Sequence, residues 1–147
     1  MKGAAIFGLM PDKLLFRVSP VTIVIEIYEK KDGQCLNQII NDDNEILCST
    51  NKTFIKMGET FKNNDIISYK IIPWSRKKLK INIYSTFEKV LSLNNGKKIG
   101  EIEYELNELK SPLKNIYIEI SMKFSNYITV SIIDSKNNYN SYILFYP

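Results

Sequence analysis

VSPVTIVIEIY, residues 18–28, is the stretch that decides the fold class of this chain. Within it every second residue is apolar, and these residues are Val21, Ile23, Ile25 and Ile27. They alternate with a mixed set, Thr22, Val24, Glu26 and Tyr28. Because successive side chains of a β-strand point to opposite faces, this pattern predicts a strand with one strongly apolar face. Pro20 stands at its entrance, where a missing N–H disturbs a hydrogen-bonded ladder least.

Similar short stretches follow along the rest of the chain. The clearest alternation of apolar and polar residues occurs at 79–84, 99–106 and 116–124. Further short strands are expected at 34–40, 53–57, 66–72, 127–133 and 141–145, with a short apolar patch at 46–48. Turn-forming residues such as Asn94-Asn95-Gly96 separate them. This spacing predicts an all-β fold, either an antiparallel β-sandwich or a partly open barrel.

Composition limits the chemistry of the chain. Its 147 residues fit one domain, or one domain with a short appendage, and its net charge of +4 permits an acidic partner without requiring one. No histidine is present, so no imidazole is available for acid–base catalysis or metal binding. No stretch approaches the ~20 apolar residues of a membrane-spanning helix, so no membrane partner is expected.

The cysteines, Cys35 and Cys48, are too few for a four-thiolate metal site. We expect two reduced thiols in a cytoplasmic protein, although the spacing of the cysteines leaves a disulfide open. Serine and cysteine nucleophiles lack a histidine base, and no glycine-rich phosphate loop occurs. The chain is therefore not expected to be an enzyme.

Three charged clusters suggest binding chemistry, and each has a simpler interpretation. Glu101, Glu103 and Glu105 alternate along one strand, which predicts a solvated strand face rather than a catalytic carboxylate pair. The acidic run at 42–45 lacks the spacing of a calcium loop. Trp74 beside the basic loop 75–78 could stack bases and hold phosphates, but a solvated loop is favoured and nucleic acid is an unlikely partner.

The order of the segments resembles the C-terminal part of a 70-kDa heat-shock chaperone, closest to the divergent heat shock 70 kDa protein 12 subfamily. The resemblance is carried by GAAIFGLMP at 3–11, by LLFRVSP at 14–20, and by the later segments 79–84, 99–102 and 116–134. It implies an antiparallel β-sandwich of the heat-shock chaperone peptide-binding type at 21–147. Residues 1–11 would be a short helical remnant of the nucleotide-binding domain, and residues 12–20 the interdomain linker.

The resemblance also implies a set of peptide-binding residues: Ile25, Ile27, Tyr28, Tyr69, Ile72, Leu79 and Ile81. Tyr28 would form one side of an arch over the peptide and Ile72 the other. The residues alone favour an ordinary apolar core, and the resemblance brings the two interpretations into balance. We leave both interpretations open at this point.

The function expected from the resemblance is chaperone-type binding of unfolded or extended apolar polypeptide segments. ATP would belong to the nucleotide-binding domain, which is almost wholly missing, so the chain would be a fragment or a truncated family member with no cofactor of its own. A nucleotide-binding domain, or a second copy through residues 1–16, is a further expected partner. The alternative is an interaction or regulatory β-sandwich that has lost peptide binding.

Overall fold

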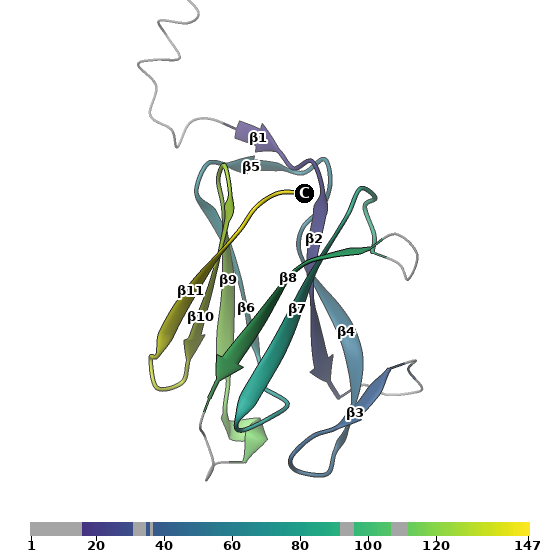
Figure 1. Ribbon diagram of the computed structural model, residues 1–147, viewed down its shortest axis with the longest axis vertical. Coiled ribbons are helices and arrows are strands. Elements are labelled where there is room, and N and C mark those ends of the chain that lie inside the picture. The colour runs from purple at the N-terminus through teal and green to yellow at the C-terminus, as the bar shows by residue number, and fades with distance from the viewer. Residues whose placement is uncertain (1–15, 31–34, 36, 92–95, 107–111) are drawn as a thin grey trace, which may run out of the picture.

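The computed structural model describes residues 16–30, 35, 37–91, 96–106 and 112–147, and β-strands dominate them (Figure 1). The expected all-β class is confirmed. Among these residues the 3-10 turn η2 (Leu113–Asn115) is the helical element, and no helix there is long and apolar enough to cross a membrane. The expected helical remnant at 1–11 and the first part of the expected linker at 12–20 lie outside the described residues.

The larger sheet has five strands in the order β3-β4-β2-β7-β8. Its members are β3 (Gln38–Ile40), β4 (Ile46–Ile55), β2 (Thr22–Glu29), β7 (Lys78–Thr86) and β8 (Lys97–Glu105). Every pairing within it is antiparallel. The stretch at 18–28 thus supplies the central strand β2, which has a neighbouring strand on each side.

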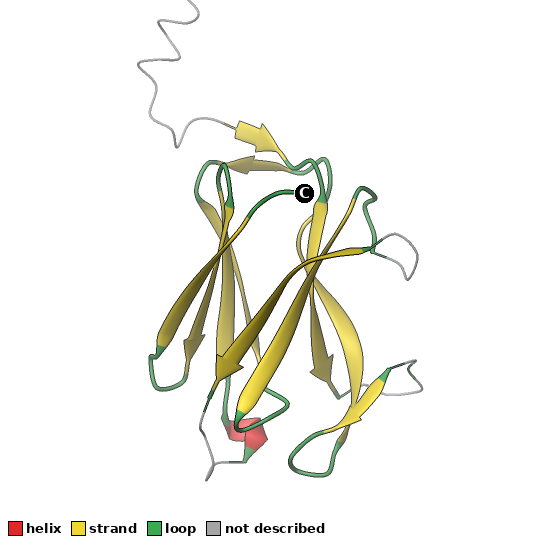
Figure 2. Ribbon diagram, in the orientation of Figure 1, coloured by secondary structure: helices red, strands yellow, loops and turns green. Residues whose placement is uncertain are grey.

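The second sheet has four antiparallel strands in the order β11-β10-β9-β6. They are β11 (Tyr139–Leu144), β10 (Ile128–Asp134), β9 (Ile118–Phe124) and β6 (Asp65–Ile71). A separate two-stranded ribbon pairs β1 (Phe16–Val18) with β5 (Thr60–Lys62). It lies across one end of the two sheets, whereas η2 and the β3–β4 turn lie at the opposite end (Figure 2).

The two sheets pack face to face and share one hydrophobic core. The larger sheet contributes the buried apolar side of β2 and of β7, including Ile23, Ile25, Leu79 and Ile81. The smaller sheet contributes alternate residues of β9 and β10. Burying each such side chain stabilises the fold by roughly 1.5–3 kcal/mol before conformational entropy is deducted. The predicted apolar face of β2 is confirmed, and Val24 on its other face is buried as well.

The region between β2 and β6 differs from the sequence prediction. The apolar patch at 46–48 and the strand expected at 53–57 belong to one continuous strand, β4. The strand expected at 34–40 forms over its last residues as β3, which pairs with β4, and β4 is the strand that pairs with β2. The polar run Ser49-Thr50-Asn51-Lys52 hides this continuity, because main-chain hydrogen bonds rather than apolar periodicity hold the middle of β4.

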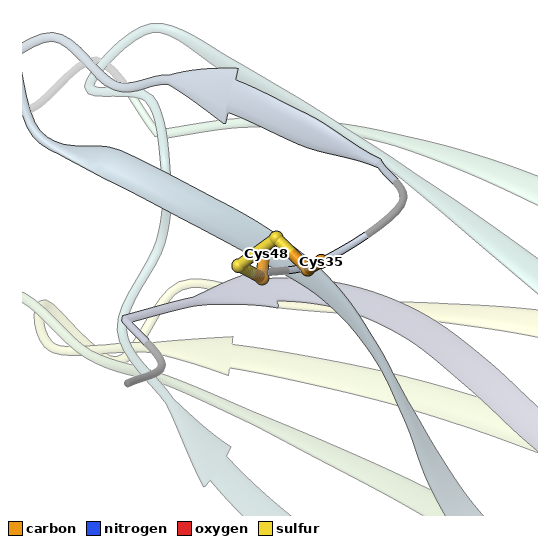
Figure 3. The surroundings of a disulfide bond; sticks show 2 residues. All are labelled: Cys35 and Cys48. Atoms are coloured by element: carbon orange, nitrogen blue, oxygen red, sulfur yellow. A yellow bond between two sulfur atoms is a disulfide. The ribbon is translucent and has the colours of Figure 1, made fainter. Parts of the chain in front are cut away.

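The expectation of two reduced thiols is wrong, since Cys35 and Cys48 form a disulfide (Figure 3). Cys48 lies buried on β4, and Cys35 lies in the connection between β2 and β3. The bond therefore closes a covalent ring that contains β3 and the β3–β4 turn. Spacing alone could not reveal it, because only the pairing of β3 with β4 shows that this connection runs back alongside Cys48.

One buried polar link joins the two sheets. The Tyr104 hydroxyl on β8 donates a hydrogen bond to Oδ2 of Asp134 at the end of β10, at 3.0 Å. The backbone N–H groups of Lys136 and Asn138 donate to Oδ1 of the same carboxylate, both at 2.9 Å. Burial by itself raises the pKa of Asp134, but these hydrogen bonds outweigh it, so the pKa of the carboxyl lies below its usual value.

Candidate functional site

A groove of about 400 Å³ opens between the two sheets at the end that carries η2. Its walls are the last residues of β2 and β6, the β3–β4 hairpin, and η2. We call it the end groove. Its volume lies within the range of natural ligand pockets. All four walls are loops or strand ends, which are the parts of a β-sandwich that most often carry binding residues.

The floor of the end groove is apolar. It consists of the buried side chains of Ile27, Leu47, Ile71 and Leu113, which come from all four walls. At the rim, Ile72 keeps 55% of its surface exposed. An apolar side chain of a ligand would therefore exchange water for hydrocarbon on several sides at once.

Tyr28 and Ile72 both line this groove. Tyr28 belongs to β2 of the five-stranded sheet, and Ile72 directly follows β6 of the four-stranded sheet. The Tyr28 ring packs edge-on against Trp74, with ring centroids 5.4 Å apart and an interplanar angle of 71°. Trp74 is two residues beyond Ile72, in the loop between β6 and β7. This loop therefore lines the groove through Ile72 and supports Tyr28 of β2 through Trp74. Burial raises the pKa of Tyr28, and the neighbouring Glu26 carboxylate raises it further.

Asp42 and Asp43 tie the walls of the groove together. Asp43 Oδ2 accepts a hydrogen bond from the backbone N–H of Leu113 at 3.1 Å, and Oδ1 pairs with the Arg76 guanidinium. Asp42 accepts from the backbone N–H of Arg76 at 2.7 Å. Arg76 holds the pKa of Asp43 below its usual value, with help from the Leu113 N–H. This carboxylate pair thus joins the β3–β4 turn to both the β6–β7 loop and η2. The described residues contain no cluster suited to a metal ion.

The β3–β4 turn is built by Asn41. Its side-chain oxygen accepts hydrogen bonds from the backbone N–H groups of Asp43 and Glu45, both at 2.9 Å. Asn44 completes the turn at a φ of 61°, which asparagine tolerates well. This geometry brings Glu45 against Lys30 at the end of β2, where the two form an ion pair that lowers the pKa of Glu45.

Only part of the predicted peptide-binding set lies in the end groove. Ile27, Tyr28 and Ile72 line it. Ile25, Leu79 and Ile81 are interior residues of the sandwich core and line no part of the groove. Tyr69 bridges the sheets outside the groove, because its hydroxyl donates to the Thr53 carbonyl at 2.7 Å. Peptide contact by the three core residues stays a prediction, and it requires the two sheets to part.

Sequence reasoning missed several groove residues, namely Leu47, Lys52, Lys70, Leu113 and Lys114. Leu113 and Lys114 lie in a short turn without periodicity, and Lys52 lies in the polar run that concealed β4. The acidic run at 42–45 was the one available signal. Its asparagine–aspartate pattern marks a tight turn, but which loops the turn joins depends on the tertiary structure.

The two other charged clusters are structural. Trp74 is buried and packs against Tyr28, so no free ring is left for stacking a base. Lys78 on β7 pairs with Glu103 at 2.8 Å, and Lys80 pairs with Glu101 at 3.0 Å. The predicted solvated face of β8 is confirmed, because its three glutamates are exposed and two of them form these cross-strand ion pairs.

The comparisons with known proteins do not assign a family. No protein-family model matches the chain, and no curated protein matches it. The end groove combines an apolar floor, two lining residues from the expected peptide-binding arch, Tyr28 and Ile72, and walls fastened to each other by Asp43.

Proposed function

We propose that this chain binds extended apolar polypeptide segments in the end groove, in the manner of the peptide-binding β-sandwich of a 70-kDa heat-shock chaperone. One observation carries the proposal: Tyr28 and Ile72, which the resemblance assigns to the two sides of an arch, both line one groove with an apolar floor. The finer assignments, a domain remnant at 1–11, a linker at 12–20 and a chaperone sandwich at 21–147, belong to the same proposal.

Main-chain hydrogen bonds would add to the apolar contacts. β6 is an edge strand of its sheet, and no other described strand pairs with its outer side. An extended peptide can add to such an edge through its own N–H and C=O groups. Lys70 and Ile71 at the end of β6 line the groove, so a peptide there would lie beside this edge.

The expected affinity follows from these contacts. One leucine side chain buried on the floor contributes roughly 1.5–3 kcal/mol, and the ordering of the peptide offsets part of this gain. Two or three such side chains with several main-chain bonds correspond to a Kd in the micromolar range, about −8 kcal/mol. Because the proposal places no nucleotide site in this chain, ATP should leave peptide release unchanged.

The test is fluorescence anisotropy of a labelled leucine-rich heptapeptide titrated with the purified chain. Ile72→Ser removes an apolar rim residue, and we expect it to weaken binding about five-fold or more. Ile66→Ser is the matched control, because Ile66 is also largely exposed, at 62% against 55% for Ile72, but lies at the opposite end of β6. The absence of any saturable binding by a folded chain would refute the proposal.

The alternative is an interaction or regulatory module that kept the sandwich but lost peptide binding. It is favoured by the burial of Ile25, Leu79 and Ile81, three residues of the predicted peptide site, inside the core. Ile81→Ser distinguishes the two functions when it is compared with Ile72→Ser. If the module has no peptide site, Ile81→Ser lowers the stability of the fold, whereas Ile72→Ser changes neither stability nor binding.

The disulfide bears on where the protein works. Such bonds are retained mainly in oxidising compartments and are rare in the cytoplasm. The Cys35–Cys48 bond therefore weighs against the cytoplasmic location that was expected from the sequence.

A further inference from the structure

We propose that the end groove selects extended segments whose apolar residues are flanked by acidic side chains. The inference rests on the proposed function and specifies its substrate class. Its basis is the charge around the groove, where four lysines and two glutamates surround the apolar floor: Lys30, Lys52, Lys70 and Lys114 with Glu29 and Glu45. The groove thus carries an excess of positive charge directly beside the surface that would bind apolar side chains.

Two carboxylates at the groove, Glu45 and Asp43, already form ion pairs within the chain. Glu45 is paired with Lys30, so neither is free to select a ligand. Lys114 acts electrostatically on Asp43, but that carboxylate already pairs with Arg76 and accepts a hydrogen bond from the Leu113 N–H. Lys52 forms no ion pair with any described residue.

Lys70 has neighbours of its own outside the groove floor. Its amino group lies 5.1 Å from the centroid of the Tyr117 ring, and Lys70 is directly opposite Glu119 in the β6–β9 register. Lys52 and Lys114 are then the lysines that stand against Glu29, at the end of β2. Around the floor a ligand would thus meet two ammonium groups and one carboxylate, a balance that attracts an acidic ligand more than a basic one.

The positions of these lysines match a peptide that lies along the groove. Lys52 is directly opposite Ile25 in the β2–β4 register, so its side chain leaves β4 on the side that faces the other sheet. Lys114 lies on η2. The two cations therefore come from two different walls around the floor. Carboxylates on either side of a central apolar residue would find a cation in both directions.

The experiment compares two labelled heptapeptides with the same central leucines, one with aspartates at both ends and one with lysines. We expect the acidic peptide to bind about ten-fold more tightly than the basic one at low salt. Its aspartates would be attracted by the groove lysines on both sides, whereas the lysines of the basic peptide would be repelled. The difference should shrink strongly at about 1 M salt, where the screening length falls to about 3 Å. The Lys52→Gln and Lys114→Gln double variant should lose most of the preference.

Lys56→Gln is the matched control, because Lys56 is an exposed lysine that directly follows β4 at the opposite end of the sandwich. Equal binding of the two peptides would overturn the charge inference and leave the proposed function standing. The same conclusion would follow if Lys56→Gln reduced the preference for the acidic peptide as much as the groove variant does. The net charge of the chain would then be responsible for the preference. Binding of neither peptide by the folded chain would overturn the proposed function together with the inference.

Discussion

Reducing the Cys35–Cys48 disulfide should lower the free energy of unfolding by about 3 kcal/mol. The two cysteines are 13 positions apart, so the ring that they close is near the ~15-residue loop for which chain entropy gives this value. Double replacement by alanine should cost somewhat more, because Cys48 is buried on β4 and its truncation also removes packing contacts. Reduction alone therefore isolates the contribution of the cross-link.

Denaturant unfolding with and without dithiothreitol measures this effect. Trp74 is the single tryptophan and is buried against Tyr28, so its fluorescence reports loss of the tertiary structure around the groove. We expect a lower midpoint in the reduced protein. The ring also contains Asn41 and Glu45 of the groove wall, so reduction should weaken peptide binding as well. An unchanged midpoint, or alkylation of both thiols in the unreduced, denatured protein, would refute the reasoning.

Three further predictions concern the core and the polar links. Ile81→Ala should lower the free energy of unfolding by about 2–5 kcal/mol, because it opens a cavity between the sheets, whereas Ile66→Ala on the exposed side of β6 should change it little; equal losses in a denaturant titration would contradict this. Tyr104→Phe should cost about 1–3 kcal/mol, since the Asp134 carboxylate loses its buried donor, and a melting temperature equal to that of the parent would exclude such a role. The folded-state pKa values of Asp43 and Asp134 lie below their unfolded values. Both groups therefore stabilise the fold fully above about pH 4 and lose this contribution as the pH falls through the lowered values. Asp134→Asn should flatten the acid limb of a stability–pH curve, and an identical limb would show that Asp134 is not responsible.

The strands of the second half of the chain were predictable because their burial is regular. In β9, for example, Ile118, Ile120 and Met122 face the core and alternate with more exposed residues, so the amphipathic period of two appears directly in the sequence. The central strand β2 was found for the same reason. β2 and β9 each lie between two other strands of their sheet and turn one face to the shared core, so the local pattern agrees with the tertiary burial.

β4 and the disulfide were not predictable because their determinants are non-local. The middle of β4 is polar, and it is a strand because β2 lies beside it, with Ile27 opposite Thr50. The bond between Cys35 and Cys48 depends in turn on the pairing of β3 with β4. No spacing rule contains either fact.

The candidate site was predictable only in part. The resemblance selected Tyr28 and Ile72, and the fold brings both to one groove. It also selected Ile25 and Ile81, which the fold buries in the core. The lysines around the groove come from β4, β6 and η2 and share no sequence motif, so their convergence could be seen only in three dimensions.

Methyl NMR of isoleucine-labelled protein, recorded as the leucine-rich heptapeptide is added, tests the central claim most directly. The account predicts that the methyl resonances of Ile27, Ile71 and Ile72 shift in a saturable way, while those of Ile66 and Ile143, which are exposed but lie outside the groove, stay in place. Saturable shifts confined to Ile66 or Ile143, or no shift at any isoleucine, would contradict it.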